Sequence, residues 1–371
     1  MPVSPTLAED LAAAIADLYE AAQGTIIQRI RDALAADIES PLWLELKARS
    51  IGDLQAAIEA VITALRLDAS GAIHRAVAEA YDRGQQAAVA ELGALTIGQA
   101  AAAASAVPAA AAVDRLANAL IADTGPVHLR ILRQTMDVYR EVVAHASSAP
   151  LLGVQTRRQA AQTALDRFTA RGVTGFIDRA GRSWDMRSYV EMATRSVVGQ
   201  AAVNAHTDRL GAAGVELVMV SEAPEECPLC RRWEGKILAR DGAPGAREVR
   251  LEHATEDGRM VTVDIAGSLP EARADGLFHP NCRHDLRAYL PGLTKRPPKP
   301  AGRGTYEDTQ RQRYYERQIR RWKREADGAM DEQKAATALA KVRRYQERIR
   351  ELVAETGLPR KRHREQLNDS R

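Results

Sequence analysis

Apolar residues recur every three or four positions along most of this chain, a spacing typical of helices that bury one face. The pattern predicts a helix over residues 6–36 and further helical stretches over 51–65, 71–92 and 113–146. Residues 155–171 repeat the pattern and are followed directly by a glycine. The first half of the chain is therefore predicted to be almost entirely helical.

Three positions qualify this helical prediction. Pro126 is predicted to begin a new helical segment, because proline lacks the amide hydrogen that a helix interior uses. Residues 98–112 are alanine-rich and contain Pro108, which predicts a helix end or a linker. Gly84 lies on the apolar face of its helix, where the missing side chain would let another helix approach closely.

The pattern changes in the middle of the chain. A long helix is predicted over residues 186–210, but short apolar runs bounded by turn residues predict β-hairpins over 173–185 and 248–265. The second hairpin turns at an Asp-Gly pair, a strong turn signal. Residues 215–220 are predicted to form a strand and 269–275 a short helix. This part of the chain is therefore predicted to be a small α+β module.

Two charged helices are predicted beyond a proline-rich linker, over residues 306–325 and 331–356, with a break at Gly328. Their thin apolar stripe suits a helical hairpin or a helix that docks on a partner. The fold class is predicted to be mostly α with a small α+β module. Its three parts are an Ala-rich N-terminal helical domain (1–150), an α+β domain with β-hairpins (151–293) and a charged, basic C-terminal helical tail (294–371).

Composition narrows the class of protein. No stretch approaches the ~20 consecutive apolar residues of a membrane span, and the N-terminus lacks the layout of a secretory signal. The chain has only three cysteines, which favours a reducing cytoplasm over a disulfide framework. Residues 294–371 carry 22 Lys and Arg against 12 Asp and Glu, whereas residues 1–293 carry 30 against 37. A basic tail on an acidic body indicates a polyanionic partner, either DNA or an acidic protein surface.

All three cysteines lie in two short motifs, Cys227-Pro-Leu-Cys230 and His279-Pro-Asn-Cys282, and His284 follows two residues later. Two ligands separated by two residues can reach one ion from a tight turn. Two such turns brought together would give a tetrahedral Cys3His shell. We therefore predict a structural Zn²⁺ site formed by Cys227, Cys230, His279 and Cys282, with His284 as the alternative fourth ligand.

Other interpretations of these cysteines remain open. They can be unmetallated thiols of a structural turn, or Cys227 and Cys230 can form a redox pair, although no βαβ pattern accompanies them. Cys282 beside His279 or His284 can also be a nucleophile, but residues adjacent in sequence rarely have the required geometry.

Seven short motifs are distinctive: TGFID (174–178), GRSWDM (181–186), YVEMATR (189–195), CPLC (227–230), WEGK (233–236), LFHPNCRH (277–284) and YQERIRE (345–351). Together they resemble the phage minor capsid protein 2 family, which is related to the Mu-type head-morphogenesis (MuF-like) proteins. The resemblance is strong over about residues 155–295, fair over the tail and weak over the N-terminal helices. It implies a structural, non-enzymatic head protein of a tailed phage or prophage, placed in the virion near the portal after assembly in the host cytoplasm. Its expected partners are the portal protein and/or the major capsid protein, with weak non-specific DNA contact through the basic tail.

Two alternative functions belong to other classes. MuF-like modules can be fused to toxin-like effectors, and polar residues of the family segment could line a catalytic cleft; these are Arg182, Asp185, Tyr189, Glu191 and Arg195. The simpler interpretation is that these residues cap a helix and form ion pairs. The second alternative is a nucleic-acid-binding zinc module that uses Arg231, Arg232, Arg283 and Arg287, although no groove-reading helix is evident.

Overall fold

The structure is a computed structural model that describes residues 5–93, 110–148, 155–172, 176–177, 183–298 and 302–367. Most of these residues are helical, as predicted. The helices are α1 (Pro5–Ala35), α2 (Trp43–Gly93), α4 (Ala110–Ser148), α5 (Arg157–Arg171), α6 (Met186–Ala212), α7 (Leu269–Ala274), α8 (Tyr306–Asp327) and α9 (Glu332–Thr356), with short 3-10 helices η2 (Arg231–Trp233) and η3 (Arg362–Glu365). No helix in these ranges is long and apolar enough to span a membrane. The Ala-rich segment 98–112 lies mostly outside them.

Local sequence signals set several helix ends. Thr156 and Gln159 form a capping box at the start of α5, each side chain binding the other residue's backbone amide. Helix α5 ends at Gly172, whose φ of 73° is accessible to glycine without strain. Helix α9 begins with Asp331 as its cap and ends at Gly357 in the left-handed conformation.

The prediction of a new helical segment at Pro126 is wrong, because α4 continues through this residue. A proline inside a helix removes one hydrogen bond and costs about 3 kcal/mol. Buried residues lie on both sides of it, including Leu120, Val127 and Ile131. Burial of a Val or Leu side chain contributes about 1.5–3 kcal/mol, so the continuous apolar face outweighs the lost bond.

The α+β module contains a five-stranded mixed sheet in the order β5-β6-β4-β3-β7. Its strands are β3 (Leu217–Val220), β4 (Ile237–Ala239), β5 (Arg247–Glu252), β6 (Met260–Ser268) and β7 (Leu286–Ala288). Strands β5 and β6 form the predicted hairpin, which turns at Gly258 with φ 75°. Neighbours pair antiparallel except β4 and β6, which are parallel. Strand β7 was not predicted, because three residues are too few to show a period.

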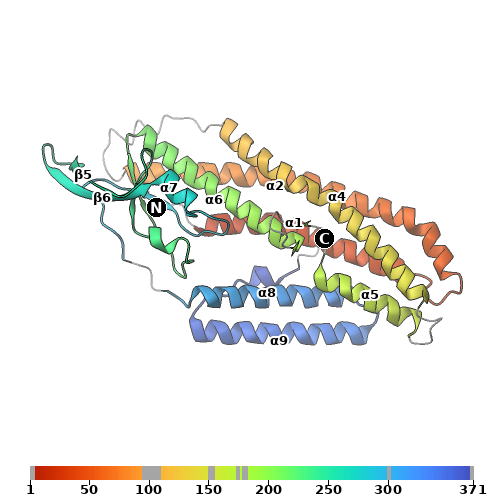
Figure 1. The fold of residues 1–371 in the computed structure, drawn as a ribbon. Helices are drawn as coiled ribbons and strands as arrows, with labels where there is room; N and C mark the ends of the chain where they lie inside the picture. Colours follow the sequence, from red (N-terminus) through yellow and green to blue (C-terminus); the bar gives the residue numbers. More distant parts are fainter. Residues whose placement is uncertain are drawn as a thin grey trace. The chain divides into compact units, whose positions relative to one another are not determined.

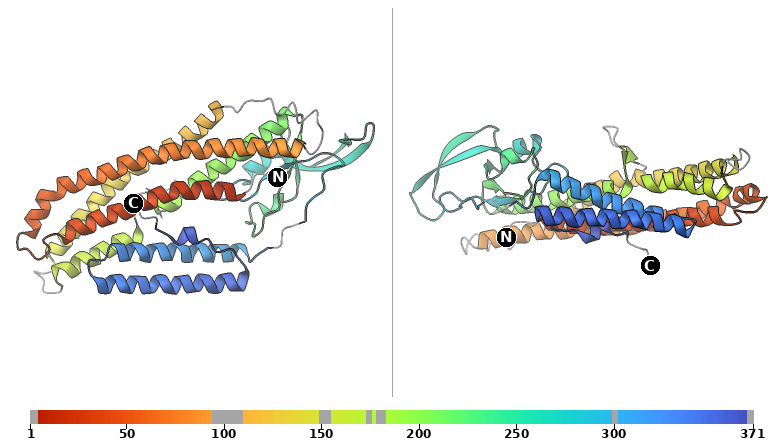
Figure 2. Two further views of the ribbon diagram at one scale, coloured as in Figure 1. Left: turned by 180° about the vertical axis from the view of Figure 1, so that it is seen from behind. Right: turned by 90° about the horizontal axis from the view of Figure 1, so that it is seen from below.

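A separate two-stranded sheet pairs β1 (Phe176–Ile177) with β2 (Ser183–Trp184) antiparallel. This agrees with the predicted hairpin over residues 173–185, although its turn lies outside the described residues. The prediction that α8 and α9 form a helical hairpin is also confirmed. Figures 1 and 2 show these two helices side by side, and Ile319 of α8 packs with Val342 and Ile349 of α9.

The chain divides into two compact units, each built from three separate stretches. Unit 1 comprises Met1–Ala12, Ile73–Leu120 and Met192–Tyr306, and unit 2 comprises Ala13–Ala72, Ile121–Glu191 and Glu307–Arg371. The division into domains along the sequence at residues 150 and 293 stays a prediction.

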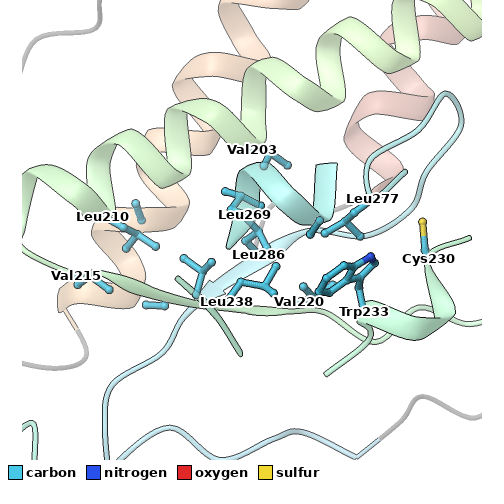
Figure 3. Close-up of a cluster of buried hydrophobic side chains, with 14 of the residues drawn as sticks. Val203, Leu210, Val215, Val220, Cys230, Trp233, Leu238, Leu269, Leu277 and Leu286 are labelled. Carbon is cyan, nitrogen blue, oxygen red and sulfur yellow. The ribbon is translucent and has the colours of Figure 1, made fainter. Parts of the chain in front are cut away.

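Unit 1 has its main core on one face of the five-stranded sheet. Side chains from α2, α6 and α7 pack there against the strands. Leu92 is one of those from α2. Figure 3 labels Leu210 of α6 and Leu269 of α7. Gly84 fits the predicted close approach, because a Cβ at this position would overlap the carbonyl of Ala202 in α6. The opposite face of the sheet carries a smaller apolar cluster around Leu217 and Ile265.

Candidate metal centre

Both cysteine motifs lie at the same end of strand β3. Strand β3 is antiparallel to β4 on one side and to β7 on the other, so the end of β3 adjoins the beginnings of both neighbours. The first motif lies in the connection from β3 to β4, and the second directly precedes β7. Sheet topology therefore brings together two motifs that are about fifty residues apart in sequence.

The first motif forms a tight turn that continues into η2. The Arg231 amide donates to the Cys227 carbonyl at 3.2 Å, and the Trp233 amide donates to the Cys230 carbonyl at 2.9 Å. Cys230 is fully buried and belongs to the main core of unit 1, near Trp233 (Figure 3). The packing of Trp233 thus fixes the turn that presents the two thiols.

The second motif is a four-residue turn that its sequence favours. The Cys282 amide donates to the His279 carbonyl at 2.9 Å, which closes the turn. Pro280 and Asn281 occupy its two central positions, and Asn281 has φ 70°. Proline followed by a residue with positive φ is the pattern of a type II turn. Helix α6 also holds this turn, because Arg195 donates a hydrogen bond to the Asn281 side chain.

The five predicted ligand residues come together in two overlapping trios that share Cys230. One trio is Cys227, Cys230 and His279, the other is Cys230, Cys282 and His284, and the ligand atoms within each trio lie within 4.8 Å of one another. All three cysteines are free thiols. This arrangement could hold a metal ion.

Distances within the cluster can be compared with a tetrahedral zinc shell. Zn–S bonds of about 2.3 Å and Zn–N bonds of about 2.0–2.1 Å give ligand–ligand separations of roughly 3.8 Å for S–S and 3.6 Å for S–N. The Sγ atoms of Cys230 and Cys282 are 3.6 Å apart, and Cys282 Sγ lies 3.4 Å from His284 Nδ1. Both values fit. Cys227 Sγ and His279 Nε2 are 2.8 Å apart, so this pair would have to separate to share an ion.

Each histidine is oriented by a hydrogen bond on its other ring nitrogen. His284 Nε2 lies 2.7 Å from the buried carboxylate of Glu234, which also accepts a hydrogen bond from the Ala223 amide. His279 Nδ1 lies 2.7 Å from the Pro280 carbonyl. Such contacts fix the tautomer and direct the remaining nitrogen toward a metal. Glu234 belongs to the WEGK motif, but the sequence by itself assigned it no role.

The thiols influence one another's protonation. A hydrogen bond from Cys230, helped by contacts with His284 and opposed by burial, lowers the pKa of Cys282 to about 4. The same hydrogen bond, together with burial, raises the pKa of Cys230. Burial disfavours protonated His284, but contacts with Cys282 and Glu234 outweigh burial and raise its pKa. Cys282 thus resembles the thiolate that metal binding and nucleophilic attack both require.

The polar residues considered for a catalytic cleft have structural contacts in the described chain. Asp185 caps α6, because its carboxylate accepts hydrogen bonds from the Ser188 amide at 3.1 Å and hydroxyl at 2.6 Å. Glu191 pairs with Arg187 and Arg364. Arg187 and Arg195 are themselves buried rather than exposed at the surface. Arg182 lies outside the described residues.

The basic side chains of α8 have different environments. Arg320 and Arg324 are buried within unit 2, so these two side chains belong to no exposed basic face. Arg321 pairs with Glu325, and Lys323 donates to Gln366. Arg317 is exposed.

The chain is similar in sequence to structural proteins of two phages. A structural protein of Lactococcus phage LL-H is 26% identical over 232 residues, which cover 59% of this chain and 58% of that relative. A structural protein of Lactococcus phage mv4 is 37% identical over 82 residues, covering 20% of this chain and 67% of that relative. The chain thus spans less than two thirds of the LL-H protein. No solved structure matches it significantly.

The family described as phage minor capsid protein 2 matches residues 3–354, nearly the whole chain and both cysteine motifs. The two relatives are likewise structural proteins of phages. The chain belongs to the phage minor capsid protein 2 family.

Proposed function

We propose that this chain is a non-enzymatic structural protein of a phage or prophage head, located near the portal, where it assists assembly, DNA packaging or ejection. The family match over residues 3–354 carries this proposal. Its partners are the portal protein and/or the major capsid protein. It acts in the virion after assembly in the host cytoplasm.

The proposed role is tested by mass spectrometry of purified virions and by deletion of the gene. The chain is expected in virions, and deletion is expected to lower the yield of DNA-filled heads. Antibody labelling should place it at the portal vertex. Absence from virions, or undiminished packaging after deletion, would reject the role.

A structural zinc ion is the second part of the proposal. Cys227, Cys230, Cys282 and one histidine supply the donors, and the two turns that carry them come from connections on both sides of β3. When bound, zinc would cross-link these turns and hold the start of β7 beside β3. Structural zinc contributes on the order of 10 kcal/mol in small modules, enough to dominate the stability of this region.

Metal removal tests the zinc site directly. The purified full-length chain is expected to contain one zinc per molecule, and chelation is expected to lower its melting temperature. Cys227→Ser should abolish zinc retention. A metal-free wild-type chain whose melting is unchanged by chelators would refute the site.

Two histidines compete to be the fourth ligand. The motif spacing predicts His279, and His284 is the alternative. The 3.4 Å contact of His284 with Cys282 and its support from Glu234 favour the alternative. Zinc content of His279→Ala and His284→Ala decides between them, because only loss of the true ligand should release the ion. Glu234→Gln should weaken zinc binding by about 10–100-fold if His284 is that ligand, and should leave it unchanged if His279 is.

A cysteine nucleophile is the competing function of these residues. Cys282, His284 and Glu234 form a chain of hydrogen bonds, as a nucleophile, its base and the group that orients the base would. Alkylation with iodoacetamide separates the two. A zinc ligand is expected to be protected in the native protein and to react only after chelation. Rapid alkylation of Cys282 in the zinc-loaded chain would favour the nucleophile.

We also propose weak, sequence-independent DNA contact through the exposed basic residues of the tail. Arg317, Arg343, Arg344 and Arg350 are exposed and suit backbone phosphates. Removal of one arginine–phosphate interaction should reduce the slope of log K against log salt by ~0.9 for duplex DNA. Substitution of these four arginines by glutamine is therefore expected to flatten the salt dependence, and an unchanged slope would reject the contact.

A further inference from the structure

Strand β5 forms one end of the five-stranded sheet in the part of the chain that the structure describes. Its six residues alternate between two environments. Arg247, Val249 and Leu251 are half-buried, whereas the side chains of Glu248, Arg250 and Glu252 are exposed. Strand β5 is drawn at the outer end of the sheet in Figure 1. An unpaired strand edge is a template for pairing with another chain.

The register of the hairpin shows which backbone groups of β5 point outward. The His253 amide donates to the Arg259 carbonyl across the hairpin, so these residues form a hydrogen-bonded pair. Such pairs alternate along an antiparallel ladder. In the register of β5 and β6, residues 247, 249 and 251 therefore direct their backbone groups toward β6. Glu248, Arg250 and Glu252 direct theirs away from the sheet.

The alternation of inward and outward backbone groups restricts how the β5 edge can pair with a second strand. In an antiparallel pair of two identical strands, a residue with outward backbone groups must lie opposite another such residue. A twofold axis can then pass only through a single residue position of β5, and the central choices are Val249, Arg250 and Leu251. An axis through Arg250 places Arg250 opposite its own copy and Glu248 opposite Glu252, so like charges meet.

The axes through Val249 and Leu251 instead place opposite charges across from one another on the two strands. An axis through Val249 places Glu248 opposite the partner's Arg250, and the twofold symmetry repeats this pair. An axis through Leu251 places Arg250 opposite the partner's Glu252, also twice. Opposite charges directly across an antiparallel pair stabilise it, and like charges destabilise it. The exposed charges of β5 are thus complementary to a second copy of β5.

We propose that β5 pairs antiparallel with β5 of a second copy of this chain, across a twofold axis through Val249. This axis pairs more of the strand than the axis through Leu251 does. The two sheets would then form one continuous sheet. A self-complementary edge of this kind generates a closed dimer rather than an open fibre.

The apolar face of the sheet continues across this interface. Val249 and Leu251 line a hollow of about 660 Å³ together with Leu217, Ile265 and Tyr289. With the axis at Val249, the two Val249 side chains are direct neighbours on this face. Pairing would bury part of the half-buried Val249 and Leu251 side chains of each copy, which adds a hydrophobic contribution to the backbone hydrogen bonds.

Molar mass measured by light scattering over a range of concentrations tests the proposal on the full-length chain. The wild type is expected to approach twice the 40.4 kDa of one chain. Arg250→Glu places glutamates opposite one another and is expected to weaken the dimer at least tenfold. Arg75→Glu makes the same charge change at an exposed position of α2, outside the sheet, and should leave the dimer unchanged.

Two further variants separate loss of pairing from loss of folding. Arg250→Pro removes only an outward amide, so it should block the dimer while the β5–β6 hairpin and the melting temperature are kept. The double variant Glu248→Arg/Glu252→Arg should be monomeric alone and should form a one-to-one dimer when mixed with Arg250→Glu. This recovery would identify the β5 edge as the interface.

Three results would overturn the proposal. The first is a wild-type chain that is monomeric at all concentrations, which would leave the edge to an extended segment of another protein. The second is a dimer that Arg250→Glu does not weaken. The third is a failure of the two charge-reversed variants to associate when mixed.

Discussion

The absence of one side chain sets the separation of helices α2 and α6 within unit 1. A Cβ at Gly84 would overlap the carbonyl oxygen of Ala202 and lie 3.0 Å from the Cβ of Ala205. The overlapping atom belongs to a helix backbone, which cannot rotate away as a flexible side chain can. Gly84 is therefore required by packing, although glycine inside a helix is less favourable than alanine by about 1 kcal/mol.

Gly84→Ala is accordingly expected to destabilise the protein. Overpacking typically costs about 1–3 kcal/mol, which exceeds the gain in helix propensity. Gly52 lies in the same helix, and a Cβ added there would meet no atom within 4 Å, so Gly52→Ala should instead stabilise by about 0.5–1 kcal/mol. Urea denaturation of both variants measures the difference, and equal effects would contradict the packing argument.

Asp185 at the start of α6 should make stability depend on pH. Burial opposes its charged form, but Arg320, Arg324 and two hydrogen bonds from Ser188 outweigh burial and lower the pKa of Asp185. A folded-state pKa below the unfolded value of about 3.9 gives stability that is present above pH 4 and lost as the pH falls through the folded pKa.

Asp185→Asn retains a side-chain acceptor for the helix cap but removes the charge. It is expected to cost about 1–2 kcal/mol at pH 7, the difference between a charged and a neutral acceptor. The gap between wild type and variant in the free energy of unfolding should narrow below pH 4. A gap that is independent of pH would show that the carboxylate charge contributes nothing.

At the scale of elements, a buried charge cluster joins α1 to α6 and α8 within unit 2. Glu20 of α1 lies 3.4 Å from Arg187, 3.9 Å from Arg320 and 3.3 Å from Arg324, and all four side chains are buried. The 3-10 helix η3 adds Arg364, which pairs with Glu191. The part of α8 that carries Arg320 and Arg324 is therefore an internal contact of this unit.

Removal of the central anion should be costly. Glu20→Gln leaves three buried guanidinium groups with less compensating charge, and breaking a buried pair typically costs about 3–5 kcal/mol. Glu59→Gln in α2 is the matched control, because Glu59 is exposed and bonds only Gln55 among its described hydrogen bonds; its effect should stay within about 0.5 kcal/mol. Thermal unfolding compares the two, and similar melting temperatures would mean that the cluster is not a net stabiliser.

At the scale of the whole molecule, the tail is part of a compact unit rather than an appendage. A chain stopped at Pro291 loses α8, α9 and η3, and with them Arg320, Arg324 and Arg364. This truncation is expected to lower the melting temperature, because Glu20 and Glu191 lose buried partners. Circular dichroism measures the melting temperature of both chains. An unchanged melting temperature of the truncated chain would contradict a stabilising role of the tail.

Because of these contacts, substitution of exposed arginines isolates DNA binding by the tail better than truncation does. Truncation would alter folding and DNA affinity together, so its result would not isolate the tail's exposed charges. Substitution of exposed arginines such as Arg343 and Arg344 leaves the buried cluster intact. The buried cluster was not evident from sequence, because Arg317 and Arg320 differ in burial although both are basic residues of one helix.

The sequence by itself determined the features that depend on neighbours along the chain. Helix positions followed from the spacing of apolar residues, and the β5–β6 hairpin from its Asp-Gly turn. The His279–Cys282 turn was also local, since Pro280 and Asn281 favour its geometry. The family resemblance rested on motifs of this same kind.

Only the tertiary structure decided the features that depend on residues far apart in sequence. These include the sheet order with parallel β4 and β6, the meeting of the two cysteine turns beside β3, the contact between Glu234 and His284, and the burial of Arg320 and Arg324. Helix α4 continues through Pro126 for a related reason, because packing on both sides outweighs the local preference. Local spacing specifies the turn or helix that carries a side chain, but the free energy gained by packing and charge pairing between distant segments determines what that side chain contacts.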